Sequence, residues 1–553
     1  MERENSKTFT ELSQEIAEKF LHTIVFVDDQ AGFIERERPE KLEKPGRGGG
    51  QGKDTQKDGN GPNTHELDAK KVIDVFAFRK MVCSVLKPDK DEELLGLAIK
   101  AAEKADVLVL DWRIYDDDGE KAMGIIGNIL ASDPTEDQRL RLIIIYTAED
   151  IVGISKKIQE KYSGNFRVDD EGFAFSRGHL RIAIFAKEGV GVPPDIEERV
   201  LSIDELSKQV SVEFAKITAG LVSNVALESL AVLRDNTHLI MGRLGPEMDP
   251  PYLAHRVLLP NPDDAMYHAV DIIASEFHSL LDTYEVGEKA NLRTIEAWID
   301  MKSREGTSFE VEVPNNDIKP VDLEHIREWQ RVGIKKSDWW SEKNISGNKK
   351  DKFSKHGHEK LTQTFCAEGM NATELDYRFA TITSFKNPYG RSERRPILTL
   401  GTVIKSESAA GSNKSEKFWL CIQPRCESVR IEKERGFFFL PLEVFDEEKD
   451  KKFDLVLEVH ESEFIKLRIN YKIYNSTHFE FSPEDSAEQV VRAKAENGDF
   501  VFYTADKTRS KFKWISELKT EHAQRIANDF AAKISRVGLD ESEWLRRWAD
   551  RRD

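Results

Sequence analysis

Only four cysteines, no long apolar run and no excess of positive charge occur in the 553 residues of this chain. The cysteines, Cys83, Cys366, Cys421 and Cys426, are too sparse for a disulfide scaffold and fit a reducing compartment. No stretch approaches the roughly 18 apolar residues of a membrane span, and the charged N-terminus lacks the apolar core of a signal peptide. The formal net charge of -18 argues against a general nucleic-acid coat, although a local basic patch remains compatible with it. We therefore expect a soluble, cytoplasmic protein.

The remaining composition is that of a globular protein with several domains. Hydrophobic residues make up 39% of the chain and charged residues 33%. A domain size of about 100–200 residues divides the length into about three domains. Residues 8–20 carry a helical apolar stripe, and a short apolar run at 22–27 follows them. Residues 36–64 are rich in Gly, Lys and Pro, so we expect a flexible loop there.

Residues 65–200 alternate between helical patterns and short apolar runs. We expect helices at 68–80, 92–104, 119–131 and 150–162, and strands in the runs 81–86, 105–110, 140–146 and 180–186. The last three runs are apolar on both faces, which is typical of central strands in a parallel sheet. With the run at 22–27 they predict a doubly wound α/β domain with five parallel strands. Residues 163–179 are expected to form an inserted turn or hairpin.

The rest of the chain indicates helices followed by a β-rich region. Residues 203–240 carry a long helical pattern, 241–300 remain helical between prolines, and 301–360 are polar and indicate a loop-rich linker. Strand patterns then dominate from about 375 to 515: ATITSF, ILTLGTVI, KFWLCIQ, GFFFLPL, FDLVLEV, FIKLRINYKIY and FVFYTA. The expected domains are an N-terminal helix at 1–20, an α/β domain at 21–235 with an insert at about 32–65, a helical segment at 236–300, a linker at 301–360, and a β-rich α+β domain at 361–553 that ends in helices.

Polar side chains stand at the carboxyl ends of four of the predicted strands. Asp28 and Asp29 follow the first strand, Asp111 ends ADVLVLD, Thr147 ends LIIIYT and Lys187 ends RIAIFAK. Ligands of an open parallel sheet bind at this edge. Three carboxylates, a hydroxyl and an amine are therefore expected on one rim.

At these residues the sequence resembles the receiver domain of two-component response regulators, which has a flavodoxin-like fold. All five signature positions match: the acidic pair Asp28 and Asp29, the phosphoacceptor Asp111, the switch hydroxyl Thr147 and the lysine Lys187. The run from Asp111 to Gly119 has the length of the family's phosphoacceptor loop. The resemblance covers residues 20–235.

The resemblance implies a phosphorylation site that uses Mg²⁺. Asp28 or Asp29, with Asp111 and the backbone carbonyl of Arg113, would supply the oxygen ligands that this hard cation prefers. Asp111 would attack phosphorus and become an acyl phosphate, while Lys187 and Thr147 would contact the phosphoryl oxygens. The implied partner is a histidine kinase or a histidine-kinase-like ATPase.

Several positions depart from the family's pattern. Glu188 follows the lysine where the family often has proline, and Tyr115 occupies the position of the proline in the phosphoacceptor loop. The switch aromatic usually lies three residues before the lysine, where this chain has Ile184, with Phe185 beside it. These departures put the usual relay from the threonine to an aromatic side chain in doubt, but not the phosphorylation chemistry.

Other clusters have simpler interpretations than a binding site. Cys421 and Cys426, with Cys366, His356 and His358, lack the spacing of a zinc site, and core packing is favoured for Cys421. Asp116, Asp117 and Asp118 indicate a solvated loop. The segment GRGGGQGKD lacks the context of a phosphate-binding loop. Arg425, Arg430 and the C-terminal arginines indicate a solvated surface, and the tryptophans are expected as core or interface anchors.

Three functions remain open from the sequence. The first is a response regulator or phosphorelay adaptor, a phosphoprotein in signalling rather than a metabolic enzyme. Its architecture is similar to bacterial "response receiver domain" proteins, a group associated with ATPases that resemble histidine kinases or the Hsp90 chaperone and with phage (antiviral) defence. The second is a receiver-regulated, nuclease-like effector that uses Asp454, Glu458 and Lys466. The third is a docking module without phosphorylation.

Overall fold

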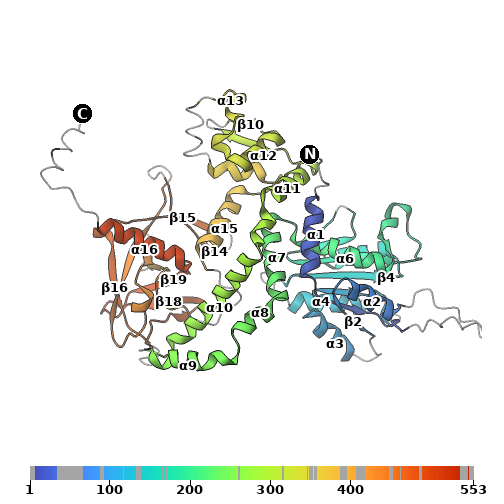
Figure 1. Cartoon of the computed structure of the whole chain (residues 1–553), viewed down its shortest axis with the longest axis horizontal. Helices are drawn as coiled ribbons and strands as arrows, with labels where there is room; N and C mark the ends of the chain where they lie inside the picture. Colours follow the sequence, from blue (N-terminus) through green and yellow to red (C-terminus); the bar gives the residue numbers. More distant parts are fainter. Residues whose placement is uncertain are drawn as a thin grey trace, which may run out of the picture. The chain divides into compact units, whose positions relative to one another are not determined.

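The computed structural model of the chain divides into two compact units (Figure 1). The first unit comprises Met1–Gly306 with Arg327–Ile334, and the second comprises Thr307–Ile326 with Lys335–Asp553. The structure describes residues 7–33, 67–87, 93–115, 117–132, 139–162, 164, 166–169, 171–259, 262–313, 317–345, 347, 353, 358–386, 395–406, 417–446, 452–460, 463–484, 489–535 and 546. The loop predicted at 36–64 and the helix with Trp544 and Trp548 lie outside these residues. Among them, no helix has the length and apolar character needed to cross a membrane.

The first unit is built on a sheet in which five consecutive strands are all parallel. The strands are β1 (Thr23–Val27), β2 (Val82–Leu86), β3 (Val107–Leu110), β4 (Arg141–Thr147) and β7 (Leu180–Lys187), in the order β2-β1-β3-β4-β7. Every residue of β3, β4 and β7 is buried, as their apolar runs predict. The sequence therefore predicts these five strands correctly.

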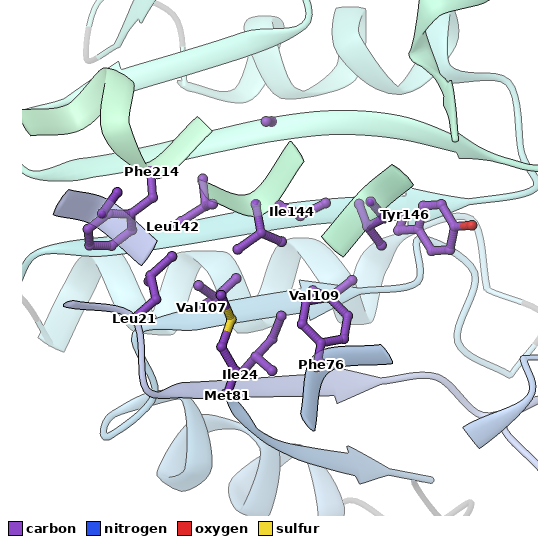
Figure 2. Packing of buried hydrophobic residues seen from close by; sticks show 14 of the residues in the cluster. Leu21, Ile24, Phe76, Met81, Val107, Val109, Leu142, Ile144, Tyr146 and Phe214 are labelled. Carbon is purple, nitrogen blue, oxygen red and sulfur yellow. The ribbon is translucent and has the colours of Figure 1, made fainter. Parts of the chain in front are cut away.

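Helices cover both faces of this sheet. One face carries α1 (Phe9–Phe20), α2 (Ala69–Phe78), α6 (Ile203–Thr218) and α7 (Leu221–Asp235), and the other carries α3 (Glu93–Ala102), α4 (Glu120–Ser132) and α5 (Ile151–Tyr162). Figure 2 shows the first core, where Phe76 of α2 and Phe214 of α6 pack with strand residues such as Ile144. Capping boxes fix the starts of α1 and α6, at Thr8 and Ser202.

The insert at 163–179 forms a hairpin that extends the sheet. Its strands are β5 (Arg167–Val168) and β6 (Ala174–Arg177), and β6 pairs antiparallel with the first half of β7. The short strand β8 (Val200–Leu201) pairs with the end of β7. The last parallel strand therefore has partners on both sides, and the sheet contains eight strands rather than five.

The long helical pattern at 203–240 is interrupted in the structure. The backbones of Ala219 and Gly220 are extended, which separates α6 from α7, and α8 (Thr237–Arg243) follows. The unit continues through α9 (Asp249–Leu258), α10 (Asp264–Thr283) and α11 (Leu292–Arg304). Pro250 and Pro251 lie in the first turn of α9, where a missing backbone N–H costs nothing.

The second unit contains a nine-stranded sheet with the order β14-β15-β13-β12-β11-β19-β18-β17, and β16 beside β13. The strands are β11 (Thr402–Ser406), β12 (Lys417–Cys421), β13 (Arg435–Val444), β14 (Leu455–His460), β15 (Glu463–Ile469), β16 (Thr477–Phe481), β17 (Lys494–Glu496), β18 (Asp499–Tyr503) and β19 (Lys511–Glu517). The helix α16 (Thr520–Ile534) packs on its core through Ala523, Ile526 and Phe530. The β-rich region is thus confirmed.

Two predictions in this region differ from the structure. ATITSF is the C-terminal part of a helix, α15 (Ala372–Ser384), whose first turn is capped by the Asn371 side chain. Residues 301–360 are not all loop, because they contain β9 (Glu310–Val313), β10 (Asp317–Pro320), α12 (Leu323–Val332) and α13 (Trp339–Glu342). Trp339 and Trp340 are fully buried and stack edge to face, which accounts for ordered structure in so polar a segment.

A buried carboxylate joins α7 to the amino ends of the parallel strands. Asp106 accepts hydrogen bonds from the backbone amides of His22 and Thr23 and from both terminal nitrogens of Arg234. Burial alone would raise the pKa of Asp106, but these hydrogen bonds outweigh it and hold the pKa below its usual range. The stabilisation is therefore present at neutral pH and is lost as the pH falls through this lowered pKa.

We expect Asp106→Asn to loosen the sheet at this end. The neutral amide cannot accept all of these hydrogen bonds and leaves Arg234 without its counter-charge, a loss of about 3 kcal/mol. Hydrogen exchange in peptides containing β1 and β3 should become on the order of a hundredfold faster. Asp74→Asn, on the exposed side of α2, is the control and should change nothing.

Candidate functional site

Four polar side chains from different strand ends meet at the carboxyl edge of the parallel sheet. Asp111 follows β3, and one of its oxygens, Oδ1, accepts a hydrogen bond from the Thr147 hydroxyl at 2.8 Å. Its other oxygen, Oδ2, lies 2.6 Å from the Lys187 ammonium. The same ammonium lies 2.8 Å from Oδ2 of Asp28. The strand order β1-β3-β4-β7 brings these residues together, although Asp28 and Lys187 are 159 residues apart.

The cluster is buried and carries more negative than positive charge. Asp28, Asp111, Thr147 and Lys187 are each at most 8% exposed. Burial and the negative charge of Asp111 raise the pKa of Asp28 in spite of the attraction of Lys187. Burial lowers the pKa of Lys187, but the two carboxylates outweigh it and the pKa lies above its usual value. One ammonium thus does not fully neutralise its acidic neighbours.

Asp29 connects the first strand to the loop that follows Asp111. Its Oδ2 accepts a hydrogen bond from the Tyr115 amide at 3.0 Å. Tyr115 has a left-handed backbone with φ 54°, which turns the loop after Asp111. The loop closes at Gly119, where φ is 87° and a Cβ would lie 2.1 Å from the buried Trp112 ring. Only glycine fits at this position, which explains why the loop ends in Asp-Gly.

The oxygen atoms of this site decide whether it fits Mg²⁺, because this hard cation prefers oxygen ligands. No three His, Cys, Asp or Glu side chains in the described part of the chain form a ready-made metal-binding group, so Asp28, Asp29 and Asp111 are not arranged as one. However, Oδ1 of Asp29 is buried and accepts no hydrogen bond. A buried carboxylate oxygen without a partner is costly, and a hard cation would satisfy it. The donor set therefore fits a magnesium ion, with the Arg113 carbonyl as a further predicted ligand.

Neither candidate for the switch aromatic is at the surface. Ile184 is fully buried in one core and Phe185 is buried in the other. Thr147 instead contacts the start of the next loop, where its hydroxyl oxygen accepts a hydrogen bond from the Glu149 amide at 3.3 Å. Glu149 in turn forms an ion pair with Arg113 at 3.3 Å. Sequence reasoning missed this link because Glu149 and Arg113 are ordinary surface charges without their spatial context.

The other residues that the sequence offered as site candidates make contacts within the fold. Cys421 is fully buried in β12, which confirms core packing. In the second unit Asp454 accepts a hydrogen bond from the Ile469 amide at 2.8 Å, and the Lys466 ammonium lies over the rings of three aromatic side chains, Tyr377, Phe445 and Phe453. Asp454 and Lys466 therefore stabilise the β14–β15 pair, and Glu458 lies on the exposed part of β14.

The fold and the rim together define a doubly wound α/β domain with an acidic, lysine-containing site at its carboxyl edge. The family model of the response receiver domain matches residues 20–192. Residues 20–192 are thus a response-regulator receiver domain, which confirms the family resemblance and supports a general role in phosphorelay signalling. Searches of curated proteins and of solved structures gave no match.

Replacing Lys187 with Met should make the receiver depend strongly on pH. Without the ammonium, Asp28 and Asp111 repel each other at neutral pH, and the variant should lose about 3–5 kcal/mol of stability. The pKa of Asp28 is already raised. Between its unfolded and folded values the native state holds more protons, so stability falls as the pH rises through this window and recovers as the pH is lowered.

The measurement is thermal unfolding in EDTA at pH 5 and pH 7.5. The transition of the receiver domain is the one that Asp106→Asn also shifts. The variant should approach the wild type at the lower pH. Equal stability of the two proteins at both pH values would show that Lys187 does not hold the carboxylates together.

Proposed function

We propose that Asp111 accepts a phosphoryl group and that the chain is a phosphorylation-dependent response regulator or adaptor. The observation that carries the proposal is the contact set of Asp111, whose two oxygens are held by Thr147 and Lys187 in a buried acidic cluster. A structural ion pair does not require two buried carboxylates on a single lysine, because the surplus negative charge destabilises the fold. A site that must hold a cation and a phosphoryl group requires that surplus.

The chemistry is an in-line transfer to a carboxylate. An oxygen of Asp111 forms a bond to phosphorus, the bond from phosphorus to the donor's imidazole nitrogen breaks, and the released imidazole takes up a proton from solvent. When bound, Mg²⁺ supplies charge neutralisation, and Asp28, Asp29 and Asp111 would hold it. Lys187 can turn its ammonium from the carboxylates toward the phosphoryl oxygens, where it neutralises charge that develops during transfer.

Thr147 can transmit phosphorylation of Asp111 to the loop before α5. In the unmodified site its hydroxyl donates to Asp111 and its oxygen accepts from the Glu149 amide. A phosphoryl oxygen on Asp111 offers a stronger acceptor for the same hydroxyl. Moving Thr147 toward it would break the contact with Glu149 and reposition the loop before α5. This route differs from the usual aromatic switch, which Ile184 and Phe185 cannot provide while buried.

The partner that fits this chemistry is a histidine kinase or a histidine-kinase-like ATPase, because a phosphohistidine is the donor that transfers to such an aspartate. An Hsp90-like ATPase partner and a role in phage defence remain predictions from the family resemblance. The output of the second unit would be a protein–protein contact, because Asp454 and Lys466 make structural contacts in the part of that unit that the structure describes.

Asp111→Asn should abolish phosphorylation. The full chain is incubated with Mg²⁺ and acetyl phosphate, and intact mass spectrometry should show one added phosphoryl group on the wild type and none on the variant. Asp118→Asn is the matched control, because Asp118 lies in the same loop but is exposed and pairs with Lys157 at the surface. An unmodified wild-type protein, or a modified Asp111→Asn variant, would contradict the proposal and favour a docking module.

Asp29→Asn should weaken metal binding without removing the phosphoacceptor. The amide retains an acceptor for the Tyr115 amide but loses the charge on the buried oxygen, so we expect at least about a tenfold loss of affinity. Binding of Mn²⁺ measured by calorimetry tests this directly, and Asp118→Asn should bind like the wild type. Equal affinities for all three proteins would exclude Asp29 as a ligand.

A further inference from the structure

The helix α10 carries a regular apolar seam that stays exposed among the residues the structure describes. Met266, Val270, Ile273 and Phe277 follow one another at alternating spacings of four and three residues. They are 53%, 64%, 39% and 40% exposed, respectively. This spacing is the heptad pattern of helices that pack along one another.

The seam lies between two anchored ends of the helix. At the start of α10, Ala265 is buried and the His268 ring contacts the His255 ring of α9. Leu280 continues the same spacing, and it is buried in a small core with Val232, Ile240 and Val286. At the C-cap of α10, the Tyr284 hydroxyl donates to Asn236 at 2.6 Å. Upstream of Leu280 almost every residue back to Met266 is exposed. The exposed apolar side chains between the two ends gain little from burial within the chain, so a partner that covers them would stabilise this part of the helix.

We propose that the occupant of this seam is α10 of a second copy of the chain, and that the protein is a homodimer through α10. Charged residues beside a heptad seam select its partner. Here the flanking positions hold uncharged side chains, Tyr267, Ala269, Ala274, Leu281 and Thr283, with Glu276 as the exception. Glu276 pairs with Arg243 of the same chain at 2.9 Å. The flanks therefore carry no unpaired charge that would attract a basic helix.

The remaining charges of α10 also allow two copies to meet. Asp264, Asp271 and Asp282 lie on the half of the helix opposite the seam, as the helical period of 3.6 residues requires. Two identical helices can thus approach along the seam without like charges facing each other. The same seam residues of two copies can pack against each other, which is the condition for a two-fold symmetric contact.

The area available is sufficient for a specific contact. Side chains of this size present on the order of 200 Å² when fully exposed. Tyr267 and each of the four seam residues expose about half of that area. Burying it in both copies removes on the order of 1,000 Å² from solvent, which is the lower limit of specific interfaces. The edge of β7 offers no competing surface, because β6 and β8 are paired with it.

The test compares Ile273→Glu with Ile272→Glu in the full, unphosphorylated chain. The two isoleucines are neighbours with nearly equal exposure, 39% and 38%, but Ile272 lies away from the seam. Glutamate keeps helix propensity, and a dimer would bring two introduced charges into one apolar seam. Sedimentation velocity should show dimers for the wild type and for Ile272→Glu, and at least tenfold weaker association for Ile273→Glu.

Two results would overturn the proposal. One is a wild type that sediments as a monomer over the micromolar range. The other is an Ile273→Glu variant that associates as tightly as Ile272→Glu. Circular dichroism of both variants should match the wild type, since both positions are similarly exposed, and this separates loss of association from loss of folding. Neither outcome depends on Asp111, so the proposed phosphorylation stands or falls separately.

Discussion

The ion pairs of Lys187 with Asp28 and Asp111 are the constraint on which the receiver's arrangement depends. They join the ends of the first, third and last parallel strands, and they do so in a pocket almost without solvent. Charges in such a place are tolerated only when they are closely paired. The order of the strands, the length of the loop after Asp111 and the burial of β7 all serve to bring three distant segments within hydrogen-bonding distance.

The two ends of the sheet use buried carboxylates in opposite ways. At the amino ends, Asp106 has both oxygens engaged by Arg234 and backbone amides, so its charge is fully compensated. At the carboxyl ends, one lysine serves two carboxylates and an oxygen of Asp29 has no partner. The first arrangement stabilises the fold, and the second leaves an electrostatic demand that a bound group can meet. This contrast distinguishes a structural cluster from a functional one.

The sequence predicts the receiver well because its physics is local and repetitive. Apolar runs buried on both faces identify β3, β4 and β7, and polar residues directly after them identify the rim. Contacts decided by tertiary packing escape such reasoning. Thr381, Ile382 and Thr383 favour a strand, yet they lie in the last turn of α15. The pairing of Asp106 with Arg234 likewise cannot be predicted from the sequence, because the two residues are 128 positions apart.

The hairpin of β5 and β6 has a consequence for how the sheet ends. Unpaired strand edges are templates onto which extended chains from other molecules can add, and short edge strands limit this hazard. The terminal strand on this side, β5, spans only Arg167 and Val168. At the other side of the sheet, β2 offers five residues, with Val82 well exposed. Strand addition to this domain, whether by a peptide ligand or in amyloid-like aggregation, is therefore directed to β2.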